Sequence, residues 1–277
     1  MQPRIRRAAA AVTAASLVLA FAIPAVAAST RTYEVTIQLV SGGQPLTPPL
    51  IATHSGGTGV FSVGQPASFG VKEIAENGNL APLITALGAD PEDADVAAAA
   101  APLVPPGSPE FGTFSDRVTL TIDADPGARF LSYQSMLICT NDGFTGLDRV
   151  QLPNQVGDSL SVGTASYDAG TEINTEDFAD IVPPCQALMG VSSGEAGTGM
   201  SDPALAEGGV IHHHPGIEGG ADLLPDVHGP ILSRWSQSPA SADRRERWPA
   251  SWRSRPSLPS VVLLTCGPHL QRLGSCP

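Results

Sequence analysis

The sequence predicts an all-β protein, an antiparallel β-sandwich with a short helical insertion after the first strand. Glycine (29) and proline (26) are abundant among the 277 residues, and only 5% are aromatic. This composition favours short strands joined by turns over a helical bundle. Several stretches also alternate apolar and polar residues, and clusters of Gly, Pro, Asp and Asn separate them.

The first 27 residues have the pattern of a secretory signal peptide. Arg4, Arg6 and Arg7 precede a long apolar run, and "PAVAA" supplies a small-residue cleavage motif that ends at Ala27. Because the run is rich in alanine and the cleavage motif follows closely, we favour a cleaved signal (residues 1–27) over a transmembrane anchor. We expect a secreted or extracellular protein, or one of the periplasm or cell envelope, without stable membrane insertion.

Five segments are candidates for strands. Residues 32–40 ("TYEVTIQLV") and 117–123 ("RVTLTID") alternate apolar and polar side chains, as half-buried strands do. Residues 129–138 ("RFLSYQSMLI") are apolar more continuously, which indicates a central strand. Weaker candidates follow at 147–152 and 158–163.

The helical insertion is predicted between the first two of these segments. Residues 71–77 ("VKEIAEN") run into Gly78, which can end a helix in the left-handed conformation. Asn79 can cap a second short helix that has Pro82 in its first turn. Residues 90–109 are of low complexity, and we expect them to form an exposed connection.

Charge separates a main domain from a different C-terminal segment. Residues 29–230 hold 25 acidic and five basic side chains, a balance of −20, and are long enough for one sandwich domain. So acidic a body is repelled by nucleic acid, whereas excess carboxylate attracts hard divalent cations.

Residues 231–277 hold seven Arg, two acidic residues and all three Trp, and show no alternation. We expect either a disordered basic tail or an out-of-frame product, in which case the closing strand of the sandwich would be missing. Lys72 is the only lysine, which is typical of a GC-rich bacterial source.

The four cysteines leave the disulfide pairing open. Cys139, Cys185, Cys266 and Cys276 allow three full pairings, and export permits disulfides. Because Cys139 lies in an apolar run, we favour a buried free thiol at this position. The absence of any C-x-x-C pair from the sequence excludes a zinc ribbon.

Two acidic motifs could form a metal site. Asp142 follows a strand-like run and precedes Gly143, so its side chain would project at one end of the sandwich. Asp168 and Glu172 bracket a short loop in which Gly170 allows the chain to turn back. Hard oxygen ligands from two loops would suit Ca²⁺. By spacing alone, ordinary turn chemistry at the Asp-Gly pair is the simpler interpretation.

These motifs resemble a known family. "TNDGFTGLD" (140–148) resembles the P-S-P-D-W-F-V-G-V-D stretch of the spondin N-terminal domain, and "YDAGTE" (167–172) resembles its Y-D-A-G-T-D. Further matches are "ATHSG" (52–56), "GVKEIAENGNLAPLITALGA" after it, and "GVIHHHPGI" (209–217), which is similar to bacterial members. The resemblance extends over about residues 33–217.

The resemblance implies a secreted, C2-like antiparallel β-sandwich that binds a divalent cation, Ca²⁺, at one end. In animal members this domain works outside the cell in adhesion and pattern recognition, so an extracellular protein or glycan partner and no enzymatic activity are implied. Carried over by position, the metal ligands are Asp142, Asp168 and Glu172. Glu172 departs from the aspartate that is frequent in the family. Glu110 and Asp116 lie in the right region for a fourth ligand but match no motif.

The three consecutive histidines support an alternative function, a secreted metalloenzyme. In an extended chain only His212 and His214 would face the same way, and a zinc site would need a third ligand such as His54 or Glu218. A Gly-bounded turn before Pro215 is the simpler interpretation. The sequence has no phosphate-loop motif, and the spacing of its Ser, His and Asp residues does not indicate a catalytic triad, so no other class of enzyme is supported. The sequence does not determine the oligomeric state.

Overall fold

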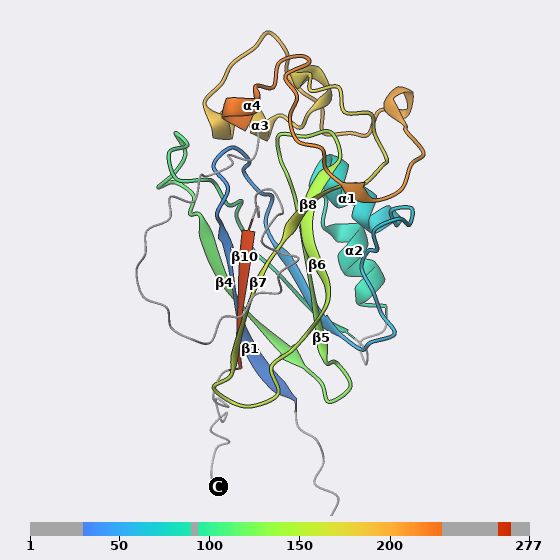
Figure 1. Ribbon diagram of the computed structural model, residues 1–277, viewed down its shortest axis with the longest axis vertical. Helices are drawn as coiled ribbons and strands as arrows, with labels where there is room; N and C mark the ends of the chain where they lie inside the picture. The colour runs from blue at the N-terminus through green and yellow to red at the C-terminus, as the bar shows by residue number, and fades with distance from the viewer. Residues whose placement is uncertain (1–29, 90–93, 229–259, 267–277) are drawn as a thin grey trace, which may run out of the picture.

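Two antiparallel sheets pack face to face, which confirms the predicted β-sandwich (Figure 1). The computed structural model describes residues 30–89, 94–228 and 260–266, and of the last segment only the backbone. The strand order is β4-β1-β10-β7 in the four-stranded sheet and β3-β2-β5-β6-β8-β9 in the six-stranded sheet. The strands are β1 Arg31–Leu39, β2 Leu50–His54, β3 Ala94–Ala98, β4 Arg117–Ala124, β5 Phe130–Met136, β6 Gly143–Gln151, β7 Ser159–Gly163, β8 Ala165–Asp168, β9 His212–His213 and β10 Ser260–Cys266.

The helical elements are short and lie outside the sandwich (Figure 1). Among the described residues, none of the helices is long and apolar enough to cross a membrane. They are α1 Phe69–Asn77, α2 Ala81–Leu87, α3 Pro184–Met189 and α4 Pro225–His228, with 3-10 turns at η1 Phe178–Asp180 and η2 Pro203–Leu205.

Each face of the six-stranded sheet is buried. One apolar cluster fills the space between the sheets, and β1 contributes Tyr33, Val35, Ile37 and Leu39 to it, as its alternation predicts. A second cluster lies between the six-stranded sheet and the elements that cover its outer face, among them α1 and α2. Burial on two sides explains why β5 is buried along nearly all of its length, and the strand occupies an interior place in its sheet.

The predicted end of α1 at Gly78 is confirmed, Asn79 bonds to the start of α2 as predicted although Leu80 holds the N-cap position, and Ser68 adds a cap that was not predicted. The Ser68 hydroxyl accepts a hydrogen bond from the Val71 N–H at the start of α1, and Gly78 ends this helix with a φ of 65°. The Asn79 side chain accepts from the Ala81 N–H at the start of α2. The same turn therefore ends one helix and begins the next.

Two details of the prediction are wrong. The helical insertion follows the second strand, because β2 lies between β1 and α1. All five residues of β2 are buried, so the strand has no alternation by which to recognise it. Residues 90–109 are not simply an exposed connection, since β3 lies within them and Leu103 and Val104 are buried.

The C-terminal segment contributes one strand. β10 pairs with β1 on one side and β7 on the other, so the four-stranded sheet is continuous through it. The other residues of 231–277, and the signal peptide predicted at 1–27, lie outside the described residues. What the sequence suggests for them stays a prediction.

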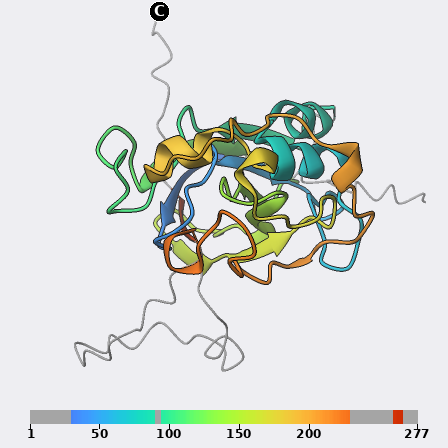
Figure 2. The same ribbon diagram turned by 90° about the horizontal axis from the view of Figure 1, so that it is seen from above.

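Long loops cover one end of the sandwich. They run between β8 and α4 and carry α3, and they are drawn in yellow and orange at the top of Figure 1 and across the face seen in Figure 2. The β5–β6 connection, which holds Asp142, reaches the same end because the Ala169 N–H donates to the Asp142 carbonyl at 3.1 Å.

Candidate metal centre

The pairing of β6 with β8 brings the two acidic motifs together. Gly143, the first residue of β6, stands opposite Asp168, the last residue of β8. Asp142 therefore lies immediately beside Asp168, and the loop that follows carries Glu172 past the Asp142 side chain. The three predicted ligands converge on one end of the sandwich, and all three are buried.

The Asp142 carboxylate is fully buried, and only one of its oxygens is satisfied. Oδ2 accepts from the Thr171 N–H at 2.7 Å, the Thr171 hydroxyl at 3.1 Å and the Glu172 N–H at 3.0 Å. Oδ1 has no hydrogen-bond partner among the residues that the structure describes. Burial, followed by the charge of Asp168, raises the pKa of Asp142 from 3.8 to about 6, although these hydrogen bonds oppose the rise.

The Asp168 carboxylate is held by its own loop. Oδ1 accepts from the Gly170 N–H at 2.8 Å, and Oδ2 accepts from the Asn174 side chain at 2.6 Å. Gly170 has a φ of 67°, and a Cβ there would approach the Val210 N to 2.6 Å. The tight turn that the sequence predicts between Asp168 and Glu172 therefore requires glycine.

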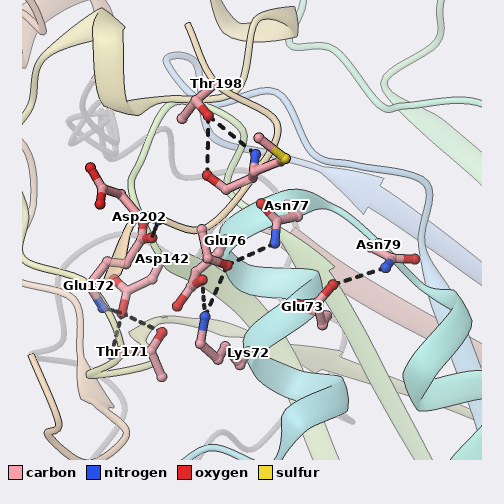
Figure 3. A network of polar contacts seen from close by, with 12 residues as sticks. Lys72, Glu73, Glu76, Asn77, Asn79, Asp142, Thr171, Glu172, Thr198 and Asp202 are labelled. Atoms are coloured by element: carbon pink, nitrogen blue, oxygen red, sulfur yellow. Dashed lines mark hydrogen bonds and ion pairs between the residues drawn. The ribbon is translucent and has the colours of Figure 1, made fainter. Parts of the chain in front are cut away.

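Glu172 lies near α1, a helix that contains none of the predicted ligands (Figure 3). Its Oε1 accepts from the Asp202 N–H at 3.0 Å. Burial raises the pKa of Glu172 from 4.5 to about 7; the carboxylates of Glu76 and Asp142 add to the rise, and the Asp202 bond and the Lys72 ammonium oppose it.

Glu76 and Lys72 of α1 complete this acidic cluster (Figure 3). The Glu76 carboxylate is fully buried and forms an ion pair with the Lys72 ammonium, one helical turn away. The ammonium also donates to the Ser201 hydroxyl at 3.0 Å. The i, i+4 spacing indicates the ion pair, but no sequence signal shows that Glu76 points into the protein.

The two residues considered for a fourth ligand are not part of the cluster. Asp116 accepts from the Gln38 side chain at 3.3 Å and lies 3.8 Å from the Arg117 side chain, against the four-stranded sheet. Glu110 belongs to the loop before β4, where its carbonyl accepts from Phe114. The carboxylate that does lie beside Asp142 and Glu172 is that of Glu76 (Figure 3).

Among the described residues, His54, His212, His213 and His214 do not form a group arranged to hold a metal ion. His212 Nδ1 lies 3.6 Å from Asp168 Oδ1 and is exposed, whereas His213 stacks on Tyr167 with ring centroids 5.2 Å apart. His214 Nδ1 accepts from the Gly216 N–H, and burial lowers the pKa of His214. His54 is buried elsewhere, against Ser132 and the Ser55 carbonyl.

The oxygen donors of the acidic cluster are of the kind that a hard cation prefers, but their side chains are not arranged around one point. Within residues 30–89 and 94–228, no group of three or more His, Cys, Asp or Glu side chains is arranged to hold a metal ion. The donors are nevertheless hard oxygens, which Ca²⁺ prefers, and Asp142 Oδ1 is buried and available. The carboxylates face backbone amides and an ammonium instead of a common point.

A disulfide supports the loop that holds Asp142. Cys139 bonds to Cys185 of α3, with an S–S distance of 2.10 Å, so the prediction of a free thiol at Cys139 is wrong. The partners lie 46 positions apart, and only the packing of α3 over the end of the sandwich brings them together.

Comparison with known proteins gives one family. Residues 45–178 match the family model described as Spondin_N. This region includes Asp142, Asp168 and Glu172 together with Lys72 and Glu76. The comparison with curated proteins gave no match.

Proposed function

Because residues 45–178 belong to the spondin N-terminal domain family, we propose that this chain is a secreted recognition module that binds a divalent cation. Membership of this family suggests an extracellular recognition or adhesion module, the role that the domain has in animal members. The proposed cation is Ca²⁺, and the proposed ligands are Asp142, Asp168 and Glu172. With the cation bound, the loops at this end would present a stiffer surface to an extracellular protein or glycan.

The observation that carries the proposal is the unsatisfied, buried carboxylate oxygen of Asp142. Its Oδ1 is a fully buried carboxylate oxygen without a partner among the described residues. Leaving such an oxygen unsatisfied costs about 1–3 kcal/mol, and the cost is higher for a charged group. The carboxylates of Asp168 and Glu172 lie close enough to repel it. Bound Ca²⁺ would supply the positive charge that offsets this repulsion.

The chain provides the means to hold the loops for a cation. Asn141, next to Asp142, accepts the N–H groups of Thr175 and Glu176 and donates to the Thr175 hydroxyl. The Glu176 carboxylate accepts three backbone N–H groups of residues 218–220. The two loops that supply the proposed ligands are therefore tied to each other and to the loop of residues 214–223, called the C-terminal loop below.

The test is the thermal stability of the mature, untagged protein with and without calcium. After dialysis against chelator, Ca²⁺ at about 100 times its Kd should stabilise the fold by about 2.7 kcal/mol. For a domain of this size that is a rise in Tm of about 5–10 °C. Asp142→Asn should remove most of the rise, whereas Asp158→Asn, an exposed change in the β6–β7 turn, should keep it. Equal responses of the two variants would exclude Asp142 from the site.

We also propose that the module is not an enzyme. His54 Nε2 lies 2.8 Å from the Ser132 hydroxyl, which lies 3.1 Å from Asp148 Oδ1. In a nucleophilic triad the histidine stands between the other two, whereas here the serine does, and both Ser132 and His54 are buried. A metalloenzyme at His212 and His214 would instead copurify with stoichiometric zinc, copper or iron, which metal analysis of the untagged protein detects.

A further inference from the structure

The only lysine of the chain lies against the acidic cluster. The Lys72 side chain is 33% exposed, but its ammonium turns inward to Glu76, whose side chain is fully buried. The Ser201 hydroxyl accepts from the ammonium at 3.0 Å and from the Asn77 side chain at 3.0 Å, which holds the ammonium in this position. The positive charge of a long side chain is thereby directed at a buried carboxylate.

Glu76 is only half satisfied by this contact. Oε2 takes the ammonium, whereas Oε1 is buried without a partner among the residues described. Asp142 Oδ1 is likewise buried without a partner among the described residues, and the carboxylates of Glu76 and Asp142 both raise the pKa of Glu172. Figure 3 shows the side chains of Glu76 and Lys72 beside those of Asp142 and Glu172. The cluster has more buried carboxylate oxygens than the ammonium neutralises.

We propose that the Lys72 ammonium is a built-in competitor for the divalent cation, and that Glu76 is the carboxylate the two cations share. This inference rests on the proposed function, because it concerns the cation site formed by Asp142, Asp168 and Glu172. With the ammonium on Glu76, the cluster is partly neutralised and the divalent cation is held more weakly. When the ammonium swings out to solvent, Glu76 becomes available as a fourth acidic side chain.

Two features of the structure permit this exchange. The Lys72 side chain is at the surface along part of its length, so it can leave without unfolding α1. Glu76 lies within α1, follows the buried Ile74 and Ala75 and is itself buried, so its carboxylate stays in place. Divalent binding in the wild type must overcome both the ion pair and the repulsion by the ammonium, and removing them should tighten binding roughly tenfold.

Calorimetric titration of the mature protein with CaCl₂ tests the proposal, with MgCl₂ in parallel. Lys72→Met keeps the length of the side chain and removes the charge, and we expect its Kd for Ca²⁺ to fall about tenfold. Arg117→Met is the matched control, because it removes one positive charge from an exposed ion pair on β4. We expect its Kd to equal that of the wild type. In Lys72→Met/Glu76→Gln the gain should disappear, because the shared carboxylate is gone.

The outcomes separate this proposal from the proposed function. Suppose that wild type binds Ca²⁺ and Asp142→Asn does not, but that Lys72→Met binds no tighter than wild type. The proposal that the Lys72 ammonium competes with the cation is then wrong, and the proposed cation site is still supported. If neither wild type nor Lys72→Met binds Ca²⁺, both are wrong. If Lys72→Met does not fold, Ser201→Ala decides, since it only releases the ammonium from its hydroxyl partner. It should bind about twofold tighter, and an unchanged Kd would overturn the proposal.

Discussion

The Cys139–Cys185 disulfide should supply a large part of the stability of this domain. Its two cysteines are 46 positions apart. In the chain-entropy account, cross-linking a loop of that length removes unfolded-state freedom worth about 4 kcal/mol at 25 °C. Both cysteines are fully buried, so alanine is a better replacement than serine, which would bury a new hydroxyl group.

The perturbation is Cys139→Ala/Cys185→Ala in a background that carries Cys266→Ala/Cys276→Ala. The background leaves Cys139 and Cys185 as the only thiols, so no other pairing can contribute. We expect a loss of about 4 kcal/mol in the free energy of unfolding, measured by equilibrium urea denaturation. For a domain of this size the melting temperature should fall by about 8–16 °C.

The fold itself should survive this change. Gln44 holds the Cys139 backbone from both sides, since its amide donates to the Cys139 carbonyl at 2.9 Å and accepts from the Cys139 N–H at 3.0 Å. The far-ultraviolet circular dichroism spectrum should therefore stay the same. An unchanged urea midpoint in the double variant, or free thiols at both positions in the oxidised parent, would refute the reasoning.

Two further predictions concern pH and the C-terminal loop. The pKa values of Asp142 and Glu172 are raised by burial to about 6 and about 7, so the folded protein retains protons that the unfolded chain releases. Without calcium, their contribution to stability is therefore greatest below about pH 4 and is lost as the pH rises to about 7. A series of melting temperatures against pH should show this loss, and Asp142→Asn should reduce it to the part that Glu172 contributes. Glu176→Ala removes the acceptor of three N–H groups, and amide exchange should accelerate at least tenfold in residues 214–223 while that of β5 stays unchanged.

The local rules of the sequence were sufficient for some of the strands and for the end of α1. The alternation in residues 32–40 identifies β1, and the glycine at position 78 identifies the end of α1. β2 escaped them because a strand buried on both faces has no period to detect. β3 escaped because its alanine-rich composition is also that of a linker.

The candidate site was predictable only in part, because only some of its residues stand in local sequence motifs. Asp142, Asp168 and Glu172 stand in motifs that resemble a family pattern, and strand pairing then places them together. Nothing in the sequence shows that Glu76 turns inward, because a Lys–Glu pair at this spacing is more often a solvated helix face.

What the sequence determined by itself is therefore what depends on neighbours along the chain: periodicity, caps, turns and the residues of two acidic loops. Only the tertiary structure decided which distant groups meet. It joined Cys139 to Cys185 and brought the Lys72 ammonium to the carboxylates. The physical reason is that the burial of a charge, and its cost, depend on what packs against it, and packing partners here come from segments far apart in the chain.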